Sequence, residues 1–81
     1  MRITGAFHGI ETREDDKGRA YHRLSIEGFR VEIPTPVAAG LLPLLRDFPT
    51  GRDITITVAP VWRGNGDHRW LSWTLLGVDL Q

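Results

Sequence analysis

Aromatic and basic side chains occur together on both sides of one glycine-rich segment. Trp62 and Arg63 precede the tip at 64–67, and Arg69 and Trp70 follow it. An indole ring can stack on a nucleobase, and the planar guanidinium of arginine matches the geometry of a phosphate. The spacing therefore indicates a stacking and phosphate-binding site. The structural alternative is an aromatic pair that stabilises a hairpin.

The dipeptide Asn65-Gly66 favours a tight hairpin turn at this tip. We therefore expect Trp62 and Trp70 to approach each other across two strands. Trp73 has the opposite parity from Trp70 and alternates with leucines, so it is the better candidate for the core.

A second group of basic and aromatic residues follows an acidic run near the N-terminus. Lys17 and Arg19 are expected at the tip of a loop, with Tyr21 and Arg23 on the polar face of the strand that begins there. Arg30 is expected on the polar face of the next strand. Tyr21, Arg23 and Arg30 would then share one surface.

Acidic residues balance this basic character. The chain carries ten basic and ten acidic residues, and zero net charge argues against a strongly basic nucleic-acid-binding protein. Glu27 and Glu32 are expected on the same polar surface, where they would neutralise some of the arginines. Nine of the ten basic residues are nevertheless arginine, the side chain best suited to stacking and to phosphate.

The sequence contains no recognisable catalytic or metal-binding pattern. It has no cysteine, and the three histidines, His8, His22 and His68, do not have the spacing of a zinc site. Asp67 lies beside His68, but no nucleophile is near, and the glycines match no phosphate-binding loop. We therefore expect a protein that is not an enzyme and that has no cofactor or metal.

The distribution of apolar residues predicts a cytoplasmic protein. No segment is apolar for long enough to span a bilayer, and the first residues lack the apolar stretch of a signal peptide. We therefore expect no membrane partner.

Alternation of apolar and polar residues predicts three strands in the first part of the chain. They cover residues 3–10, 21–27 and 29–33. The polar segment 11–19 is expected to form the first hairpin loop, and Gly28 a tight turn.

The periodicity then changes to that of a helix over residues 35–48. Thr35 is a suitable N-cap, and Pro36 stands where a proline is tolerated in the first turn. Gly40 and Pro43 disfavour a helix interior, so we expect a kinked or two-piece helix.

Two further strands, at 54–59 and 68–80, complete the pattern. Pro60 is expected at an edge or bulge near the end of the strand at 54–59. Closing such short strands into a barrel removes their exposed edges. The prediction is one all-β domain over residues 1–81 with a small helical insertion, in the order β-β-β-α-β-β of a five-stranded OB-fold barrel. An SH3-like barrel is the main alternative, but it offers no natural place for the helix.

Near the N-terminus, Thr12-Arg13 is followed by a short polar run and then by Lys17-Gly18-Arg19-Ala20-Tyr21. This pattern resembles the first loop of the filamentous-phage single-stranded DNA-binding proteins. Chain length is also similar. The resemblance implies an OB-fold homodimer that coats single-stranded DNA cooperatively during phage replication. It implies phosphate contacts for Arg13, Lys17 and Arg19 and base stacking for Tyr21.

The leading hypothesis is therefore a protein of phage or plasmid-type DNA replication that binds single-stranded DNA with little sequence preference. RNA is the less favoured ligand, and the host cytoplasm is the expected compartment for a phage-encoded chain. The alternative is a small OB-fold protein-interaction module that does not bind nucleic acid, with the same aromatic residues as anchors. The predicted nucleic-acid-binding residues are Arg13, Lys17, Arg19, Tyr21, Arg23, Arg30, Trp62, Arg63, Arg69 and Trp70.

A homodimer is expected from the apolar run at residues 75–80, which has apolar residues on both faces. A barrel this small does not easily bury both faces by itself. Self-association would cover the remainder.

Overall fold

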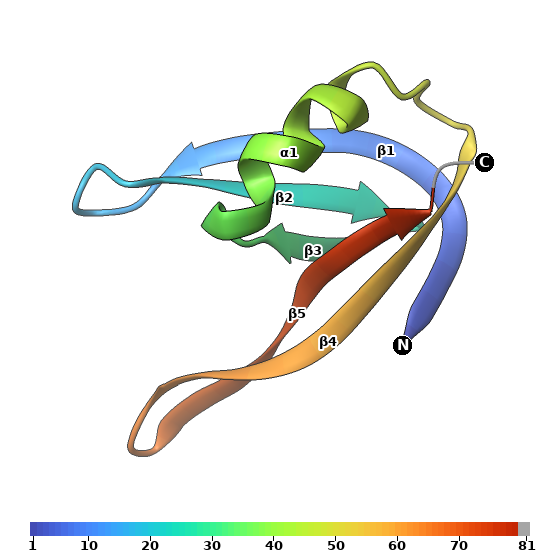
Figure 1. The fold of residues 1–81 in the computed structure, drawn as a ribbon. Coiled ribbons are helices and arrows are strands. Elements are labelled where there is room, and N and C mark those ends of the chain that lie inside the picture. The colour runs from blue at the N-terminus through green and yellow to red at the C-terminus, as the bar shows by residue number, and fades with distance from the viewer. Residues whose placement is uncertain (80–81) are drawn as a thin grey trace.

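The computed structural model describes residues 1–79 and shows five strands with one helix between the third and the fourth (Figure 1). This order of elements confirms the one expected from the sequence. The elements are β1 (Arg2–Glu14), β2 (Ala20–Ile26), β3 (Phe29–Ile33), α1 (Thr35–Arg46), β4 (Asp53–Asn65) and β5 (His68–Asp79).

The five strands form one closed barrel in the spatial order β1-β2-β3-β5-β4. All neighbouring pairs are antiparallel except β3 and β5, which run parallel and join at a single pair, Glu32 with Thr74. β4 and β5 continue to pair with each other past this point, as far as Asn65 and His68, so the β4–β5 hairpin extends well beyond the barrel (Figure 1).

β1 takes part in both halves of the barrel because it bends. Its first residues, from Arg2 to Ala6, pair with β4, and the residues from Phe7 onward pair with β2. The register shifts between Phe7 and Gly9, and Gly9 has a φ of 109°, a conformation that suits glycine at a bulge. Beyond the bend, β1 continues to Glu14, so the first loop is shorter than the segment 11–19 predicted.

The turn between β2 and β3 contains a non-glycine residue with positive φ. Glu27 (φ 46°) and Gly28 (φ 81°) have the backbone conformation of a tight hairpin turn. Glu27 also binds β1, because its backbone N–H donates to the Ala6 carbonyl and its Oε1 accepts from the Ala6 N–H at 2.7 Å. The expectation that Glu27 neutralises arginines on a strand face was therefore wrong.

The helical segment differs from the prediction at its start. Pro34 occupies the N-cap position, so Thr35 lies inside the helix rather than capping it. The helix is one continuous segment that includes Pro43, not two pieces. Ala38 and Leu45 are buried against the barrel end, where Phe48 meets Phe7 edge to face with ring centroids 5.5 Å apart.

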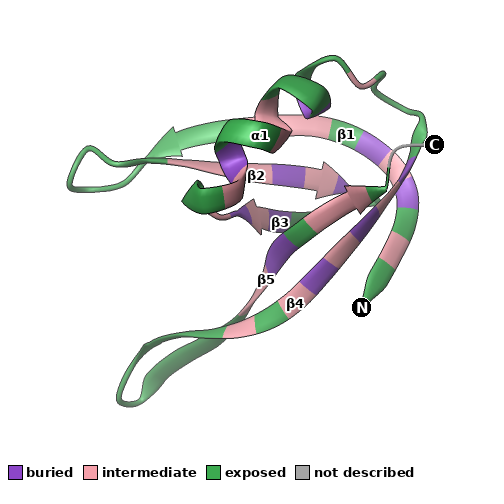
Figure 2. Cartoon of the chain, in the orientation of Figure 1, coloured by how far each residue is buried: buried purple, intermediate pink, exposed green. Residues whose placement is uncertain are grey.

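The core lies inside the barrel and follows the alternation read from the sequence. Figure 2 shows buried positions in the barrel part of the strands and exposed residues over both long hairpin tips. Trp73 packs partly buried against this core, as predicted. The buried hydrophobic residues are Phe7, Leu24, Ile26, Val31, Ile33, Ala38, Leu45, Ile54, Ile56, Val58 and Leu75.

β4 runs through Pro60, although the sequence pattern ended the strand there. The Val58 N–H donates to the carbonyl of Met1, the residue just before β1 begins. Backbone nitrogens two residues apart in a strand point to the same side, so the nitrogen of Pro60 points past the end of β1. A proline, which lacks an N–H, is tolerated at such an edge.

The C-terminal run has both buried and exposed apolar residues. Leu75 is fully buried and Val78 packs against the core, whereas Leu76 is exposed. Leu80 lies outside the described residues.

Candidate nucleic-acid interface

Polar and aromatic side chains of β1, β2 and β3 share the outer surface of the barrel. Arg13 lies opposite Tyr21, Arg23 lies opposite Glu32, and Arg30 lies opposite Ser25. Directly opposed residues in antiparallel strands share a face, and the residues between them point into the core. Tyr21, Arg23 and Arg30 therefore do share a surface, as predicted. This outer face comprises Glu11, Arg13, Tyr21, Arg23, Ser25, Arg30 and Glu32.

The two acids of the outer face each pair with one arginine. Glu11 forms an ion pair with Arg13, and Glu32 forms one with Arg63 at 2.7 Å. The guanidinium of Arg23 lies over the Tyr21 ring, 5.2 Å from its centroid. Within residues 1–79, Arg23 and Arg30 form no ion pair, so these two cations remain available to an anionic ligand.

The tip of the β1–β2 hairpin is ordered by one of its acids. Asp15 Oδ1 accepts from the backbone N–H groups of Lys17 (2.9 Å) and Arg19 (2.8 Å). Gly18 adopts a φ of 77° between them. The acidic run therefore has a structural role, because Asp15 holds the turn that carries the exposed Lys17 and Arg19.

The tryptophans of the β4–β5 hairpin do not form the expected cross-strand pair. Trp62 pairs with Leu71, and Trp70 pairs with Arg63. The turn has only two residues between Asn65 and His68, whereas a three-residue loop would have set Trp62 opposite Trp70. A shift of one residue moves a side chain to the other face of a strand, so the two rings lie on opposite faces.

Each face of this hairpin carries one aromatic ring and one arginine. On one face the Arg69 guanidinium lies over the Trp62 ring, 5.5 Å from its centroid. On the other face are Arg63 and Trp70. Trp62 is 62% exposed and Trp70 is 55% exposed, so neither belongs to the core.

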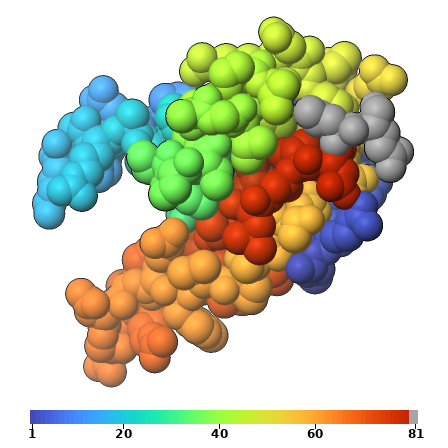
Figure 3. Space-filling model, in the orientation of Figure 1, coloured from blue at the N-terminus to red at the C-terminus, as the bar shows by residue number. Residues whose placement is uncertain are grey.

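A groove separates the two projecting hairpins, and the space-filling view shows the hollow between their tips (Figure 3). At its base is a pocket of about 450 Å³, within the range of small-molecule sites. Aromatic residues from both hairpins line it together with the Glu32–Arg63 ion pair. The lining residues are Tyr21, His22, Glu32, Ile33, Pro34, Thr35, Arg63 and Trp70.

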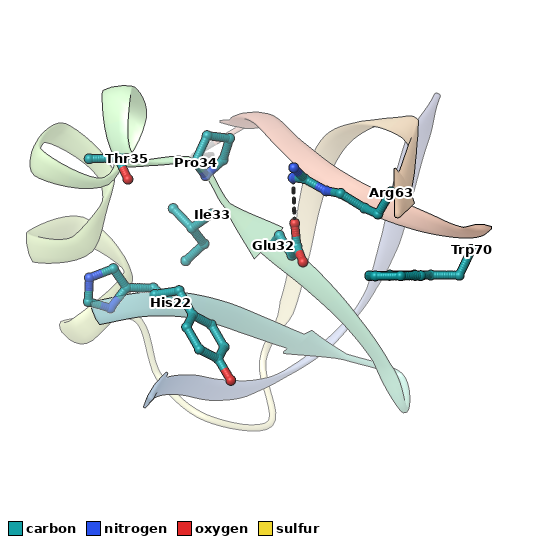
Figure 4. A pocket seen from close by; sticks show the side chains of 8 residues that line it. His22, Glu32, Ile33, Pro34, Thr35, Arg63 and Trp70 are labelled. Atoms are coloured by element: carbon teal, nitrogen blue, oxygen red, sulfur yellow. Dashed lines mark hydrogen bonds and ion pairs between the residues drawn. The ribbon is translucent and has the colours of Figure 1, made fainter. Parts of the chain in front are cut away.

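The side chains in the pocket come from four parts of the chain (Figure 4). Trp70 lies at one end, and His22 and Thr35 lie at the other. The apolar Ile33 and Pro34 lie between these ends, and the Glu32–Arg63 pair is on the Trp70 side.

Gly64 leaves room for the Trp70 ring beside the strand backbone. A β-carbon at Gly64 would lie 2.8 Å from Trp70 Cζ3 and 2.0 Å from the His68 carbonyl oxygen, and its φ of 91° also favours glycine. The glycine allows the indole to lie close to the strand backbone.

Five of the pocket residues were not among the predicted binding residues: Glu32, which was expected only to neutralise arginines, and His22, Ile33, Pro34 and Thr35. His22 alternates with core leucine and isoleucine, and its Nδ1 hydrogen-bonds Thr12 Oγ1 at 2.9 Å. It reaches the groove because β2 extends beyond the barrel end. Ile33, Pro34 and Thr35 adjoin it through the β3–α1 connection, and no local pattern predicts this contact.

The predicted site residues fall into three places. The groove and outer face hold Arg13, Tyr21, Arg23, Arg30, Arg63 and Trp70, the β1–β2 tip holds Lys17 and Arg19, and the far face of the β4–β5 hairpin holds Trp62 and Arg69. The aromatic and basic residues that the sequence placed around one tip therefore lie as two separate pairs on opposite faces of the hairpin.

In the part of the chain that the structure describes, no three histidine or acidic side chains gather closely enough to hold a metal ion. Nor does any helix of residues 1–79 have the length and apolar character needed to cross a membrane.

Comparisons with protein families, with characterised proteins and with solved structures found no match to this chain.

Proposed function

We propose that this protein is an OB-fold that binds single-stranded DNA in the groove between its β1–β2 and β4–β5 hairpins. The observation that carries the proposal is that Tyr21 and Trp70, from different hairpins, line one groove beside Arg63. The OB-fold assignment is supported by the strand order of the closed barrel and by the position of the helix between β3 and β4.

In this proposal, aromatic rings hold the bases and cations hold the backbone. Stacking on Tyr21 and Trp70 contributes about 1 to 3 kcal/mol per base and tolerates any base. Arg23 and Arg30 on the outer face, with Lys17 and Arg19 at the hairpin tip, contact phosphates. Because the acids neutralise Arg13 and Arg63 in part, we expect moderate affinity. The salt dependence of binding should come mainly from Lys17, Arg19, Arg23 and Arg30.

The biological setting is also a proposal. The first-loop resemblance favours DNA replication in a phage or plasmid, in the cytoplasm of the host, and a homodimer. The exposed Leu76 of β5 supports self-association. Sedimentation is expected to give a dimer at micromolar concentration, and a monomer there would contradict the dimer.

Fluorescence titration with oligo-dT tests single-strand binding directly. The exposed Trp70 is expected to be quenched at low salt, and duplex DNA of equal length is expected to bind more weakly. A Trp62→Phe variant removes the signal of the other exposed tryptophan and serves as the control. No quenching at low salt, or equal affinity for duplex, would reject the proposal.

A second candidate function rests on the far face of the β4–β5 hairpin. Trp62 and Leu71 lie opposite each other there, and both are exposed. Exposed aromatic and aliphatic side chains on one face are typical of a protein contact. A partner captured from host lysate after nuclease treatment, and lost with Leu71→Ser, would favour this function.

A further inference from the structure

The pocket at the base of the groove contains a carboxylate where a surface for phosphate alone would contain only cations. Glu32 lines this pocket with Arg63, and Arg63 Nη2 donates to Glu32 Oε2 at 2.7 Å. A carboxylate repels phosphate, so the groove face formed by Glu32 suits a group that donates hydrogen bonds.

We propose that this pocket binds one guanine base of the single strand, with Glu32 accepting from the Watson–Crick edge. This inference rests on the proposed function and adds a base preference to it. The remaining bases of the strand stack on the protein without being distinguished.

Guanine fits because its hydrogen-bond donors match the acceptor oxygens of Glu32. Its N1–H and 2-amino group are adjacent donors, and an ionised carboxylate can accept two such bonds with its two oxygens. Thymine offers one donor on this edge, and adenine and cytosine offer one amino group each. Guanine is therefore the base that best satisfies Glu32.

Arg63 can donate to the acceptor atom of guanine that lies beside the donors bound by Glu32. The ion pair with Glu32 occupies one N–H of Arg63, and a guanidinium has five. The others remain able to donate to guanine O6, which lies beside N1–H. Arginine to O6 and N7 is also the commonest specific contact to guanine.

The rest of the pocket suits the flat face of a base. Trp70 stands at the same end as the Glu32–Arg63 pair, and the apolar Ile33 and Pro34 lie next to them (Figure 4). A base stacked on Trp70 would present its edge toward the ion pair. The partial exposure of Glu32, 33% for its side chain, limits the strength of these hydrogen bonds.

The test compares an oligo-dT strand with strands that carry one dG, dA, dC or deoxyinosine at the centre. We expect the dG strand to bind about fivefold to tenfold more tightly than oligo-dT. Deoxyinosine keeps N1–H and O6 but lacks the 2-amino group, so its strand is expected to bind with intermediate affinity. The dA and dC strands are expected to bind like oligo-dT.

Glu32→Gln assigns the preference to the carboxylate. This variant is expected to bind oligo-dT at least as tightly as the parent, because a negative charge is lost, but to lose the preference for dG. Glu11→Gln is the matched control, since Glu11 also pairs with an arginine of the outer face but does not line the pocket. It is expected to keep the preference, and circular dichroism establishes that both variants are folded.

The outcomes separate the two proposals. If oligo-dT does not bind the parent protein, the single-strand proposal fails and the guanine pocket fails with it. If oligo-dT binds but the dG strand binds no more tightly, or if Glu32→Gln retains the preference, only the guanine pocket fails.

Discussion

Trp62 and Trp70 lie on opposite faces of the β4–β5 hairpin, because Trp62 pairs with Leu71 and Trp70 with Arg63. In the proposed complex, a single strand of DNA in the groove would stack on Trp70 but not on Trp62. The Trp62 ring is instead covered on one side by the Arg69 guanidinium. The two halves of the aromatic and basic segment thus have different expected roles.

Replacement of the two tryptophans is expected to have unequal effects on oligonucleotide binding. Trp70→Ala removes a stacking surface in the groove and should weaken oligo-dT binding by about 1 to 3 kcal/mol, with little change in the salt slope. Trp62→Ala should weaken binding much less. Binding of both variants is measured by fluorescence anisotropy of a labelled oligonucleotide, after circular dichroism has shown that they are folded. Equal losses would mean that the strand contacts both faces.

Replacement of outer-face arginines is expected to reduce the salt dependence of binding according to how each is paired. Arg30→Ala should lower the slope of log K against log salt by about 0.7, because one phosphate contact on a single strand is lost. Arg13→Ala should lower it less, since Arg13 already pairs with Glu11. Titrations at four or more salt concentrations provide the slopes. A larger effect for Arg13 would show that the strand displaces Glu11.

Asp15 is expected to stabilise the β1–β2 hairpin despite its negative charge. Asp15→Ala removes the acceptor of two backbone N–H groups, those of Lys17 and Arg19, and should lower the free energy of unfolding by about 1 kcal/mol. Asp16→Ala is the control, as it removes the same charge from the same exposed tip. Urea denaturation measures both, and equal midpoints for the two variants would contradict the structural role of Asp15.

Gly5 and Glu27 are expected to be energetically coupled. A β-carbon at Gly5 would lie 2.1 Å from Glu27 Cγ, so Gly5→Ala must displace Glu27 and break its hydrogen bond to the Ala6 N–H. We expect a loss of about 1 to 3 kcal/mol in the free energy of unfolding.

In a Glu27→Gly background, the same Gly5→Ala substitution should cost clearly less. The side chain that it meets is gone, and glycine suits the positive φ of residue 27. A double-mutant cycle by urea denaturation measures this coupling. Additive effects would show that Gly5 tolerates a side chain by some other adjustment.

The number and order of the strands and the place of the helix followed from the sequence alone. The core face of a strand can be read from its alternate residues, because side chains of a strand alternate between its two faces. Leu24 and Ile26 mark this face on β2, and Val31 and Ile33 mark it on β3. The shared surface of Tyr21, Arg23 and Arg30 followed from the same alternation, since neighbouring strands bring like faces together.

Only the tertiary structure decided the register of the β4–β5 hairpin and the composition of the groove. A change of one residue in the turn moves the side chains of one strand to the other face relative to its partner strand, and Asn65-Gly66 is compatible with more than one turn. The Glu32–Arg63 ion pair joins strands that are distant in the chain, so no local pattern contains it. The role of Asp15 likewise depends on backbone N–H groups whose directions exist only in the folded turn. Residue types thus determined which chemistry the chain carries, and packing in three dimensions decided which of these groups meet.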